Sequence, residues 1–423
     1  MIKEKKSGEQ EDLMKLLHTA DLHLDRSFEG LKNSPKQIAE KLQQANHKAI
    51  TAIVDIAIRN QVDAVILAGD TFHQSRTSIR TQAYFIDEMK RLDQEGIPVI
   101  MSFGNHDYYV AERYWFDFPK NMFLFKKEQV ETHYFMTKNQ EKVAVTGFSY
   151  EHPWINEDKL SGFPTKEAGV DIHIGVYHGD TTKNGAQNYA PFTFSAMKSK
   201  GYDYWALGHI HQPQVVSADP LIVYPGTPQG HTKKERTVQG VAIVSIEAGH
   251  ATVRFEPVAQ VSWQVEKYSL RQAGSLQEAL SILTELMLKA GPTSGQLLLK
   301  EIQLTDIVQL GEEFQLAYEN GELLHYLQNR LLQQTNHSLF LFRVEVVAED
   351  LTKKVMITAA PELLGQLEKN YLQPDIFSNT LQELVQNPLF SSVVSINEEW
   401  RERSVEQADQ KIKEDFVIQE DQT

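Results

Sequence analysis

The first half of the chain alternates short apolar runs with longer segments in which apolar residues recur every three or four positions. The run from Val65 to Ala68 has the length and composition of a buried strand, whereas residues 38–60 and 77–94 show the spacing of amphipathic helices. Such alternation is typical of a sheet with helices packed against it. It predicts an α/β fold from about residue 14 to about residue 219.

Three strand-like segments follow closely after this region, at residues 221–223, 240–246 and 251–258. Consecutive strands favour antiparallel pairing, so we expect a second, antiparallel sheet behind the first. The predicted fold class is therefore α/β, a four-layer sandwich in which two β-sheets are flanked by helices.

A small C-terminal α/β cap domain is predicted after residue 264. The sequence Ser275-Leu276-Gln277-Glu278 has the form of a capping box, which predicts the start of a helix that ends near Lys289. Two strand-like segments, residues 296–304 and 338–347, enclose a helical segment at residues 321–332. The predicted parts of the chain are a flexible extension at 1–13, a main domain at 14–264, the cap at 265–360, a helical segment at 361–396 and a charged tail at 397–423. The helical segment has two open interpretations, partner docking and ordinary packing.

Acidic residues are concentrated in the C-terminal part of this 423-residue chain, whose formal net charge is −15. Residues 1–265 contain 29 Lys and Arg against 32 Asp and Glu, whereas residues 266–423 contain 13 against 25. A strongly acidic surface is a poor match for nucleic acid, because phosphates attract Lys and Arg. The nearly balanced charge of the first part weakens that objection there, and bound metal ions would weaken it further.

The composition also restricts the location and the kind of metal site. No segment approaches the roughly 18 consecutive apolar residues of a membrane-spanning helix, and the first residues lack the apolar core of a signal peptide. We therefore expect a cytoplasmic protein with no membrane partner. The sequence contains no cysteine, which excludes disulfides and thiolate ligands. A metal site must then use His, Asp and Asn, which suit Mn²⁺, Fe²⁺ or Zn²⁺.

Five apolar runs end in residue types that bind metals. The carboxyl ends of strands in an open α/β sheet meet at one crevice, so we expect these side chains to converge. An Asp-x-His pair or a Gly-Asp turn is common in ordinary loops, but the ordered set predicts a two-metal hydrolase site, which activates water and holds the oxygens of a phosphoryl group. The motifs are Asp21-x-His23, Gly69-Asp70, Gly104-Asn105-His106-Asp107, His178 and Gly208-His209-x-His211.

With these motifs in this order, the sequence resembles the calcineurin-like metallophosphoesterase superfamily over roughly residues 14–260. The segments at residues 14–24 and 224–229 resemble its DNA-repair exonuclease branch in particular, the SbcD-like nucleases and the Bacillus YhaO-type proteins. The resemblance implies a metallophosphoesterase (nuclease) domain at 14–264 and two divalent metal ions, of which Mn²⁺ is the expected one. It also implies DNA as the substrate and an SMC-like coiled-coil ATPase as a partner, and it leaves a homodimer open.

The resemblance further assigns roles to the residues of the motifs. It implies one metal held by Asp21, His23, Asp70 and His211, and a second held by Asp70, Asn105, His178 and His209. His106 would be catalytic without binding a metal, because it would stabilise the scissile phosphate or protonate the leaving oxygen. Asp107 would orient the imidazole of His106.

His178 has two competitors for its place in this set, His152 and His173. His173 lies inside the same apolar run, where a hydrogen-bonded core histidine is expected, whereas His178 ends the run as the other motifs do. We therefore favour His178 as the ligand.

Candidates for contact with the substrate lie close to the motifs in the sequence. A tyrosine beside the site can stack on a base, and cations can pair with phosphates. For each candidate an ordinary surface or packing role is the alternative. The candidates are His73, Arg76, Tyr108, Lys183 and His231.

The leading function is hydrolysis of DNA phosphodiester bonds by a two-metal phosphodiesterase, as a DNA-repair exonuclease. One alternative is a metallophosphoesterase that acts on a small phosphodiester or another phosphate ester. Another is a non-catalytic assembly subunit of an ATPase complex. The cap and the segment at 224–229 favour the nuclease, and the complete ligand set argues against a vestigial site.

Overall fold

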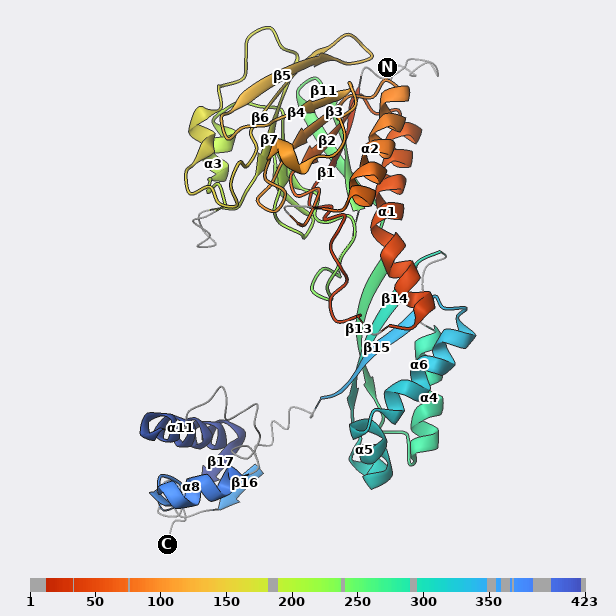
Figure 1. Ribbon diagram of the computed structural model, residues 1–423, viewed down its shortest axis with the longest axis vertical. Helices are drawn as coiled ribbons and strands as arrows, with labels where there is room; N and C mark the ends of the chain where they lie inside the picture. The colour runs from red at the N-terminus through yellow and green to blue at the C-terminus, as the bar shows by residue number, and fades with distance from the viewer. Residues whose placement is uncertain are drawn as a thin grey trace, which may run out of the picture. The chain divides into compact units, whose positions relative to one another are not determined.

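The computed structural model of the protein describes residues 13–32, 34–74, 77–181, 189–236, 240–289, 295–347, 355–358, 366, 369–382 and 397–419. The chain divides into two compact units, Met1–Glu345 and Val346–Thr423. Figure 1 shows both units and the labels of their helices and strands. The predicted domain boundaries at 264 and 360 stay predictions. Most of the extension predicted at 1–13 and of the helical segment predicted at 361–396 lies outside the described residues.

The first sheet has six strands in the order β12-β11-β1-β2-β3-β4. Its strands are β1 (Met14–Thr19), β2 (Ala64–Ala68), β3 (Val99–Ser102), β4 (Met122–Leu124), β11 (Gly240–Glu247) and β12 (His250–Pro257). Strands β1 to β4 are parallel, whereas β11 pairs antiparallel with β1 and with β12. The expectation that the segments at 240–246 and 251–258 belong to a separate second sheet is wrong. Strand β1 is almost entirely buried and β11 pairs along its free edge, from Met14 opposite Ile246 to His18 opposite Ala242.

The second sheet also has six strands, in the order β5-β6-β7-β8-β10-β9. Its strands are β5 (Glu131–Met136), β6 (Lys142–Gly147), β7 (Ile172–His178), β8 (Tyr204–Gly208), β9 (Gln214–Ala218) and β10 (Leu221–Tyr224). The central strands β6, β7, β8 and β10 are parallel, and the edge strands β5 and β9 are antiparallel to their neighbours. The second sheet is therefore mostly parallel rather than antiparallel.

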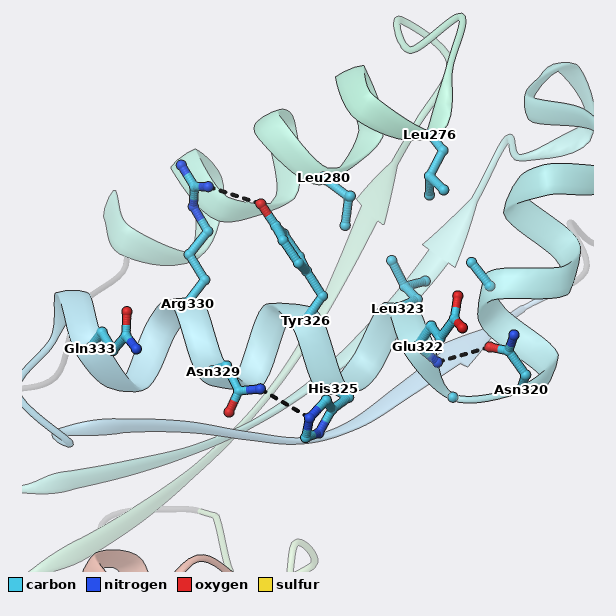
Figure 2. A pocket seen from close by; sticks show the side chains of 12 residues that line it. Leu276, Leu280, Asn320, Glu322, Leu323, His325, Tyr326, Asn329, Arg330 and Gln333 are labelled. Atoms are coloured by element: carbon cyan, nitrogen blue, oxygen red, sulfur yellow. Dashed lines mark hydrogen bonds between the residues drawn. The ribbon is translucent and has the colours of Figure 1, made fainter.

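A smaller sheet with helices beside it follows in the same unit. Its elements are β13 (Val261–Ser269), α4 (Leu276–Lys289), β14 (Leu297–Thr305), α5 (Gly311–Glu319), α6 (Glu322–Gln334) and β15 (Leu339–Val346). A groove of about 800 Å³ is lined by residues from α4, α5 and α6, among them Leu280, Tyr326 and Arg330, and Arg330 donates to the Tyr326 hydroxyl (Figure 2). None of the predicted metal ligands lines this groove.

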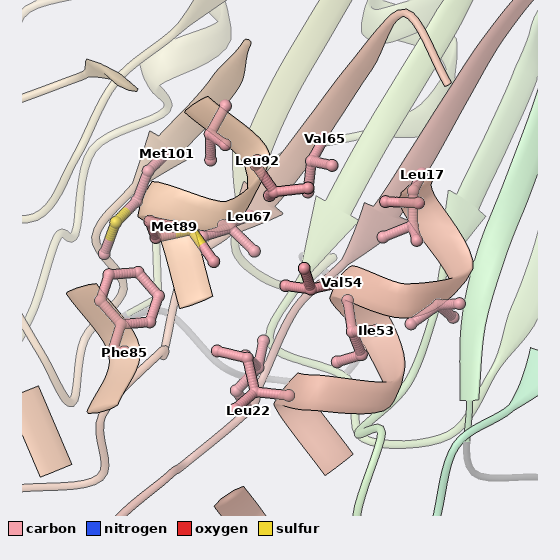
Figure 3. Packing of buried hydrophobic residues seen from close by; sticks show 14 of the residues in the cluster. Leu17, Leu22, Ile53, Val54, Val65, Leu67, Phe85, Met89, Leu92 and Met101 are labelled. Carbon is pink, nitrogen blue, oxygen red and sulfur yellow. The ribbon is translucent and has the colours of Figure 1, made fainter. Parts of the chain in front are cut away.

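Helices and apolar side chains complete the layers around the two large sheets. Helices α1 (Lys36–Arg59) and α2 (Ile79–Gln94) pack on the first sheet, where Val54 and Phe85 belong to the same apolar cluster as Leu67 (Figure 3). The two sheets share a core cluster that includes Ile66 and Ile174. The short helix α3 (Phe194–Lys198) covers the other face of the second sheet. This is the predicted four-layer α/β sandwich.

The second unit contains a parallel strand pair and two helices. They are β16 (Val355–Thr358), α8 (Pro374–Thr380), α11 (Glu398–Asp415) and β17 (Phe416–Gln419). The charged segment predicted at 397–423 thus contains a helix and a strand, and the strand begins with the short apolar run Phe416-Val417-Ile418. Among the described residues, no helix combines the length and the apolar character that crossing a membrane requires.

Candidate metal centre

All five motifs lie at the carboxyl ends of parallel strands in the two large sheets. Asp21 and His23 follow β1, Asp70 follows β2, and Asn105 follows β3. His178 is the last residue of β7, and His209 and His211 follow β8. The ligand atoms of Asp21, His23 and His211 lie within 4.8 Å of one another, and so do those of Asp21, Asp70 and His178. The structure therefore brings five residues of the predicted ligand set together, Asp21, His23, Asp70, His178 and His211.

The carboxylate of Asp70 lies between two groups of imidazoles. Its Oδ2 is 3.4 Å from Nε2 of His178 and 4.0 Å from Nε2 of His23. Its Oδ1 accepts a hydrogen bond of 2.9 Å from the backbone N–H of His106. Asp70, His23 and His178 are all almost completely buried. A single buried carboxylate thus faces both halves of the predicted site.

The first half of the site contains two imidazoles that face each other. Nε2 of His23 is 3.2 Å from Nε2 of His211, which is in turn 3.8 Å from Oδ1 of Asp21. Two nitrogen lone pairs at such a distance repel each other unless a proton or a cation lies between them. The arrangement fits a cation held by His23, His211 and the nearby carboxylates.

The second half of the site places an imidazole nitrogen against oxygen acceptors. Nδ1 of His178 donates to the backbone carbonyl of Ala68 at 2.9 Å, so Nε2 of the neutral ring has only a lone pair to offer. That Nε2 faces Oδ1 of Asn105 at 3.2 Å and Oδ2 of Asp70 at 3.4 Å. Nδ1 of His209 is 3.3 Å from the same Asn105 oxygen. Acceptors that converge in this way fit a second cation.

The electrostatics of the buried groups agree with this geometry. Burial alone would raise the pKa of the Asp70 carboxyl, but the imidazoles of His178, His23 and His106 hold it well below its usual range. Burial alone would lower the pKa of His178, yet the Asp70 carboxylate raises it. Burial lowers the pKa of His209 to about 3. The buried Asp70 carboxylate thus stays ionised and attracts positive charge, as a ligand of a divalent cation does.

The backbone is strained at four of the predicted ligands. The φ angles of Asp21, His23, Asp70 and His209 are 52°, 44°, 52° and 101°. Residues with a Cβ avoid this left-handed region, and such strain is concentrated at functional sites. Hydrogen bonds stabilise these loops, because the N–H groups of Asp21 and His23 donate to the carbonyls of Gly69 and Asp70 at 3.1 and 3.0 Å. The strain is thus held in place by the pairing of two neighbouring strand ends.

Gly69 leaves the space that His178 occupies. A Cβ at this position would overlap Nδ1 of His178, and the φ of Gly69 is +89°. Gly96 also has a positive φ, +67°, but a Cβ there would meet nothing within 4 Å. We expect Gly69→Ala and Gly96→Ala to share the cost of about 1–2 kcal/mol for a left-handed alanine. Gly69→Ala should lose about 1–3 kcal/mol more through overpacking, and it should weaken Mn²⁺ binding.

Urea unfolding and Mn²⁺ titration calorimetry of both alanine variants measure these effects. Equal stability and equal Mn²⁺ affinity in the two variants would contradict the proposed contact between Gly69 and His178.

Asp107 does not orient the imidazole of His106, so that prediction is wrong. Its buried carboxylate accepts hydrogen bonds from the backbone N–H groups of Asp70, Thr71, Phe72 and Gly104, at 2.7 to 3.3 Å. The side chain therefore turns toward the loop after β2 and away from the imidazole. Asp107 fixes the backbone that presents Asp70.

His106 lies at the edge of the site. Its Nδ1 is 3.2 Å from the backbone carbonyl of His73, which can only accept, so Nδ1 bears a proton. Its ring stacks on that of His73 with centroids 4.6 Å apart, and the ring of His23 lies 5.1 Å away. Among the described residues, Nε2 of His106 has no hydrogen-bond partner, so this nitrogen is available to a substrate.

The other substrate-contact candidates differ in what the structure supports. His231 is completely buried, with its Nε2 2.9 Å from Oδ1 of Asn46, so the prediction that it contacts a phosphate is wrong. It follows a Pro-Gly loop, but the smaller sheet covers that loop. Tyr108 is partly exposed, and its hydroxyl accepts from Arg113 at 2.6 Å. Arg76 and Lys183 lie outside the described residues.

The two competitors of His178 are far from ligand geometry. His173 is buried, with Nε2 2.8 Å from the Thr146 hydroxyl and its ring stacked on Tyr202, as a core histidine should be. His152 is exposed, with its imidazole beside Glu128.

A buried histidine outside the predicted ligand set should make the fold sensitive to acid. His18 in β1 is enclosed between Tyr204 and the carbonyl of Leu207, and burial lowers its pKa to about 3. The ordinary pKa of histidine is near 6.5, so between pH 6.5 and pH 3 the unfolded chain binds a proton that the folded chain excludes. The stability from this residue is complete above pH 6.5 and is lost as the pH falls. Between pH 7 and pH 5 the loss should be about 2 kcal/mol.

Urea unfolding of the wild type and of His18→Gln at pH 7 and pH 5 isolates the contribution of His18 to the free energy of unfolding. The variant should lose about 2 kcal/mol less than the wild type on acidification. An identical loss in both proteins would show that His18 titrates normally in the folded state.

Two functional candidates were missed by sequence reasoning, Glu235 and Arg26. The Glu235 carboxylate accepts from Nδ1 of His211 at 2.6 Å and from Arg26 at 3.0 Å. Burial alone would raise the pKa of Glu235, but the hydrogen bond from His211 and the charge of Arg26 hold it at about 2. Glu235 lies 24 residues after His211 in a loop with several other charges, and no spacing rule distinguishes it.

Comparison with known proteins agrees with this geometry. The calcineurin-like phosphoesterase family matches residues 14–213. The uncharacterized metallophosphoesterase YhaO of Bacillus subtilis is 27% identical over 380 residues, which cover 88% of this chain and 90% of that protein. The SbcD component of the nuclease SbcCD, from the same species, is 24% identical over 351 residues, 74% of this chain and 85% of the relative.

A more distant relative comes from an archaeon. The DNA double-strand break repair protein Mre11 of Methanopyrus kandleri is 22% identical over 290 residues, 63% of this chain and 61% of that protein. The chain thus spans only about three fifths of this relative. Taken with the family match over residues 14–213, the chain contains a calcineurin-like phosphoesterase domain and is a metal-dependent phosphoesterase with YhaO, SbcD and Mre11 proteins among its relatives.

Proposed function

We propose that this protein is a two-metal phosphodiesterase that hydrolyses phosphodiester bonds of DNA, as an exonuclease of DNA repair. The observation that supports this most is the position of Asp70, whose Oδ2 is within 4.0 Å of imidazoles from both halves of the site. A carboxylate that two ions share is typical of enzymes that transfer phosphoryl groups.

The residues present fit two divalent cations. Their donors are carboxylate oxygens, one amide oxygen and imidazole nitrogens, and several of these face one another at 3.2 to 3.3 Å. When bound, such ions supply an activated water and neutralise charge on phosphoryl oxygens. We assign one ion to Asp21, His23, Asp70 and His211, and the other to Asp70, Asn105, His178 and His209.

His106 is the residue that we assign to the leaving group or to the phosphate. Its Nδ1–H is fixed by the carbonyl of His73, so Nε2 is the atom that holds or donates the moving proton. The imidazole is half-buried and stacked on His73, which limits its rotation. A general acid in such a position contributes about 10²–10⁴-fold to the rate.

The choice of DNA as the substrate is supported by the relatives and by exposed cations. One relative is a nuclease component by name and another is a DNA double-strand break repair protein. Arg80, Lys234 and Arg236 are exposed on or next to the loops that surround the centre, where they can pair with phosphates. We further propose Mn²⁺ as the metal, a cytoplasmic location and an SMC-like ATPase as the partner.

The test is an assay on two substrates in parallel. The purified protein is incubated with Mn²⁺ and end-labelled linear DNA, and separately with bis-(p-nitrophenyl) phosphate, each with and without EDTA. We expect Mn²⁺-dependent shortening of the DNA, which EDTA abolishes. Cleavage of the small diester with intact DNA, even when a candidate ATPase is present, would contradict the nuclease proposal and favour a small-molecule phosphoesterase. No cleavage of either substrate would favour an assembly subunit.

A further inference from the structure

We propose that Glu235 is a positioning residue for the metal ligand His211, an assignment that rests on the proposed two-metal function. Glu235 lies beyond the region that matches the calcineurin-like phosphoesterase family, residues 14–213. It belongs to the segment from Pro225 to Arg236, which we call the 225–236 loop and which follows β10.

The carboxylate of Glu235 accepts hydrogen bonds from at least four donors. Its Oε1 accepts from Nδ1 of His211 at 2.6 Å and from Arg26 at 3.0 Å. Its Oε2 accepts from the backbone N–H groups of His231 and Thr232 at 2.7 and 3.1 Å. Only 8% of the side chain is exposed. A buried carboxylate with this many donors has one orientation, so it holds the ring of His211 in one orientation as well.

The hydrogen bond to Glu235 determines which nitrogen of His211 faces the metal centre. A carboxylate only accepts, so Nδ1 of His211 must bear the proton. Nε2 then presents its lone pair toward Nε2 of His23 and Oδ1 of Asp21, at 3.2 and 3.8 Å. This is the arrangement in which an acidic partner behind an imidazole fixes the tautomer and increases the basicity of the coordinating nitrogen.

The 225–236 loop is anchored on the side of the metal centre. The N–H of Thr227 donates to the carbonyl of His211 at 3.0 Å, and its hydroxyl donates to the carbonyl of Asp21 at 2.9 Å. The 225–236 loop is therefore attached to the residues that follow strands β1 and β8.

The same loop is anchored on the side of the smaller sheet. The indole N–H of Trp263 in β13 donates to the carbonyl of Gly230 at 3.0 Å. Lys233 pairs with both carboxylate oxygens of Glu301 in β14, at 3.0 and 3.1 Å, and only 1% of the Glu301 side chain is exposed. Glu235 is thus held between two rigid sheets rather than on a free loop.

Replacement of Glu235 by glutamine should misplace one proton without changing the volume of the side chain. The backbone N–H groups of His231 and Thr232 require an oxygen at one end of the amide, which turns the amide N–H₂ toward Nδ1 of His211. Arg26, which can only donate, then loses its acceptor at this end. Nδ1 of His211 must then accept, so Nε2 bears the proton and loses its lone pair for the metal. Loss of such a partner lowers metal affinity by about 10–100-fold.

The experiment is a Mn²⁺ titration by calorimetry of the full-length wild type, of Glu235→Gln and of Glu256→Gln. Glu256 is the matched control, because it forms ion pairs with Arg59 and Arg254 on the surface. We expect two Mn²⁺ per wild-type chain and two per Glu256→Gln chain. In Glu235→Gln one of the two sites should weaken by about 10–100-fold while the other keeps its affinity.

The outcomes separate the two levels of the proposal. A wild type that binds no Mn²⁺ at these residues would overturn the proposed function itself. Two unchanged sites in Glu235→Gln, or two sites weakened equally, would overturn the role of Glu235 in positioning His211 while leaving the proposed function intact.

A second measurement decides the question if Glu235→Gln does not fold. The ring ¹⁵N signals of His211 in the wild type, assigned by their absence from His211→Asn, report which nitrogen bears the proton at pH 8. We expect a protonated Nδ1 and an Nε2 signal that shifts on titration with Zn²⁺. A protonated Nε2, or a Zn²⁺-dependent shift at Nδ1 instead, would overturn the proposal.

Discussion

Asp70→Asn should abolish metal-dependent hydrolysis, with kcat/KM lower by on the order of 10³-fold or more, because metal ions supply several kcal/mol of transition-state stabilisation. Asparagine has the shape of aspartate but no charge, and its amide nitrogen cannot bind a cation. Since Asp70 faces His178 and His23 at 3.4 and 4.0 Å, the variant should lose affinity at both metal sites. Steady-state kinetics on a phosphodiester and Mn²⁺ titration of the same sample measure the two effects.

The matched control for this variant is Asp87→Asn. The side chain of Asp87 is 70% exposed on α2 and forms an ion pair with Lys90. The control should therefore keep wild-type activity and bind two Mn²⁺. An active Asp70→Asn protein would mean that the metal centre lies elsewhere in the chain.

His106→Ala should separate catalysis from metal binding. We expect kcat to fall by about 10²–10⁴-fold, the usual contribution of a general acid, while both Mn²⁺ ions stay bound. Alanine retains the backbone N–H that donates to Oδ1 of Asp70 at 2.9 Å, so the bridging carboxylate should keep its position. Single-turnover kinetics and Mn²⁺ calorimetry on the same protein test both parts of this prediction.

His152→Ala is the control for this substitution, because His152 is an exposed histidine whose imidazole lies beside Glu128 and not beside the metal centre. It should leave kcat unchanged. Loss of one Mn²⁺ in His106→Ala would identify His106 as a ligand and would contradict its assignment to proton transfer.

The strand ends were predictable from the sequence because each parallel strand leaves a local signature. A buried strand is a short apolar run, and a ligand placed directly after it reaches the crevice regardless of how the sheets connect. The run at Val65 to Ala68 and the motif that follows it are an example, since β2 and Asp70 lie where the pattern predicts. Helices α1 and α2 were predictable for the same local reason.

The pairing of strands was less predictable because it depends on contacts between distant segments. Strand β11 has the same apolar composition whether it lies in the first sheet or the second, and only the free edge of β1 determines its place. The buried state of His231 could not be predicted either, because β13 covers its loop from more than 30 residues away along the chain. Both errors concern tertiary partners rather than local structure.

The residues around the ligands were the least predictable part of the site. The sequence places Asp107 next to His106, yet its carboxylate binds backbone N–H groups of the loop after β2. Glu235 looks like one charge among several in a polar loop, and only the folded chain places it against His211. Adjacency in the sequence thus did not predict the hydrogen-bond partners of Asp107 and Glu235. Position at the end of a strand did predict which ligands lie together.

The most direct test of the two-metal centre is anomalous diffraction from crystals that contain Mn²⁺, recorded at the manganese absorption edge. We predict two anomalous peaks about 3.5–4 Å apart, one on each side of the Asp70 carboxylate, with His23 and His211 beside one peak and His178 and His209 beside the other. A single peak, or peaks that are not in contact with Asp70, would contradict the proposed two-metal centre.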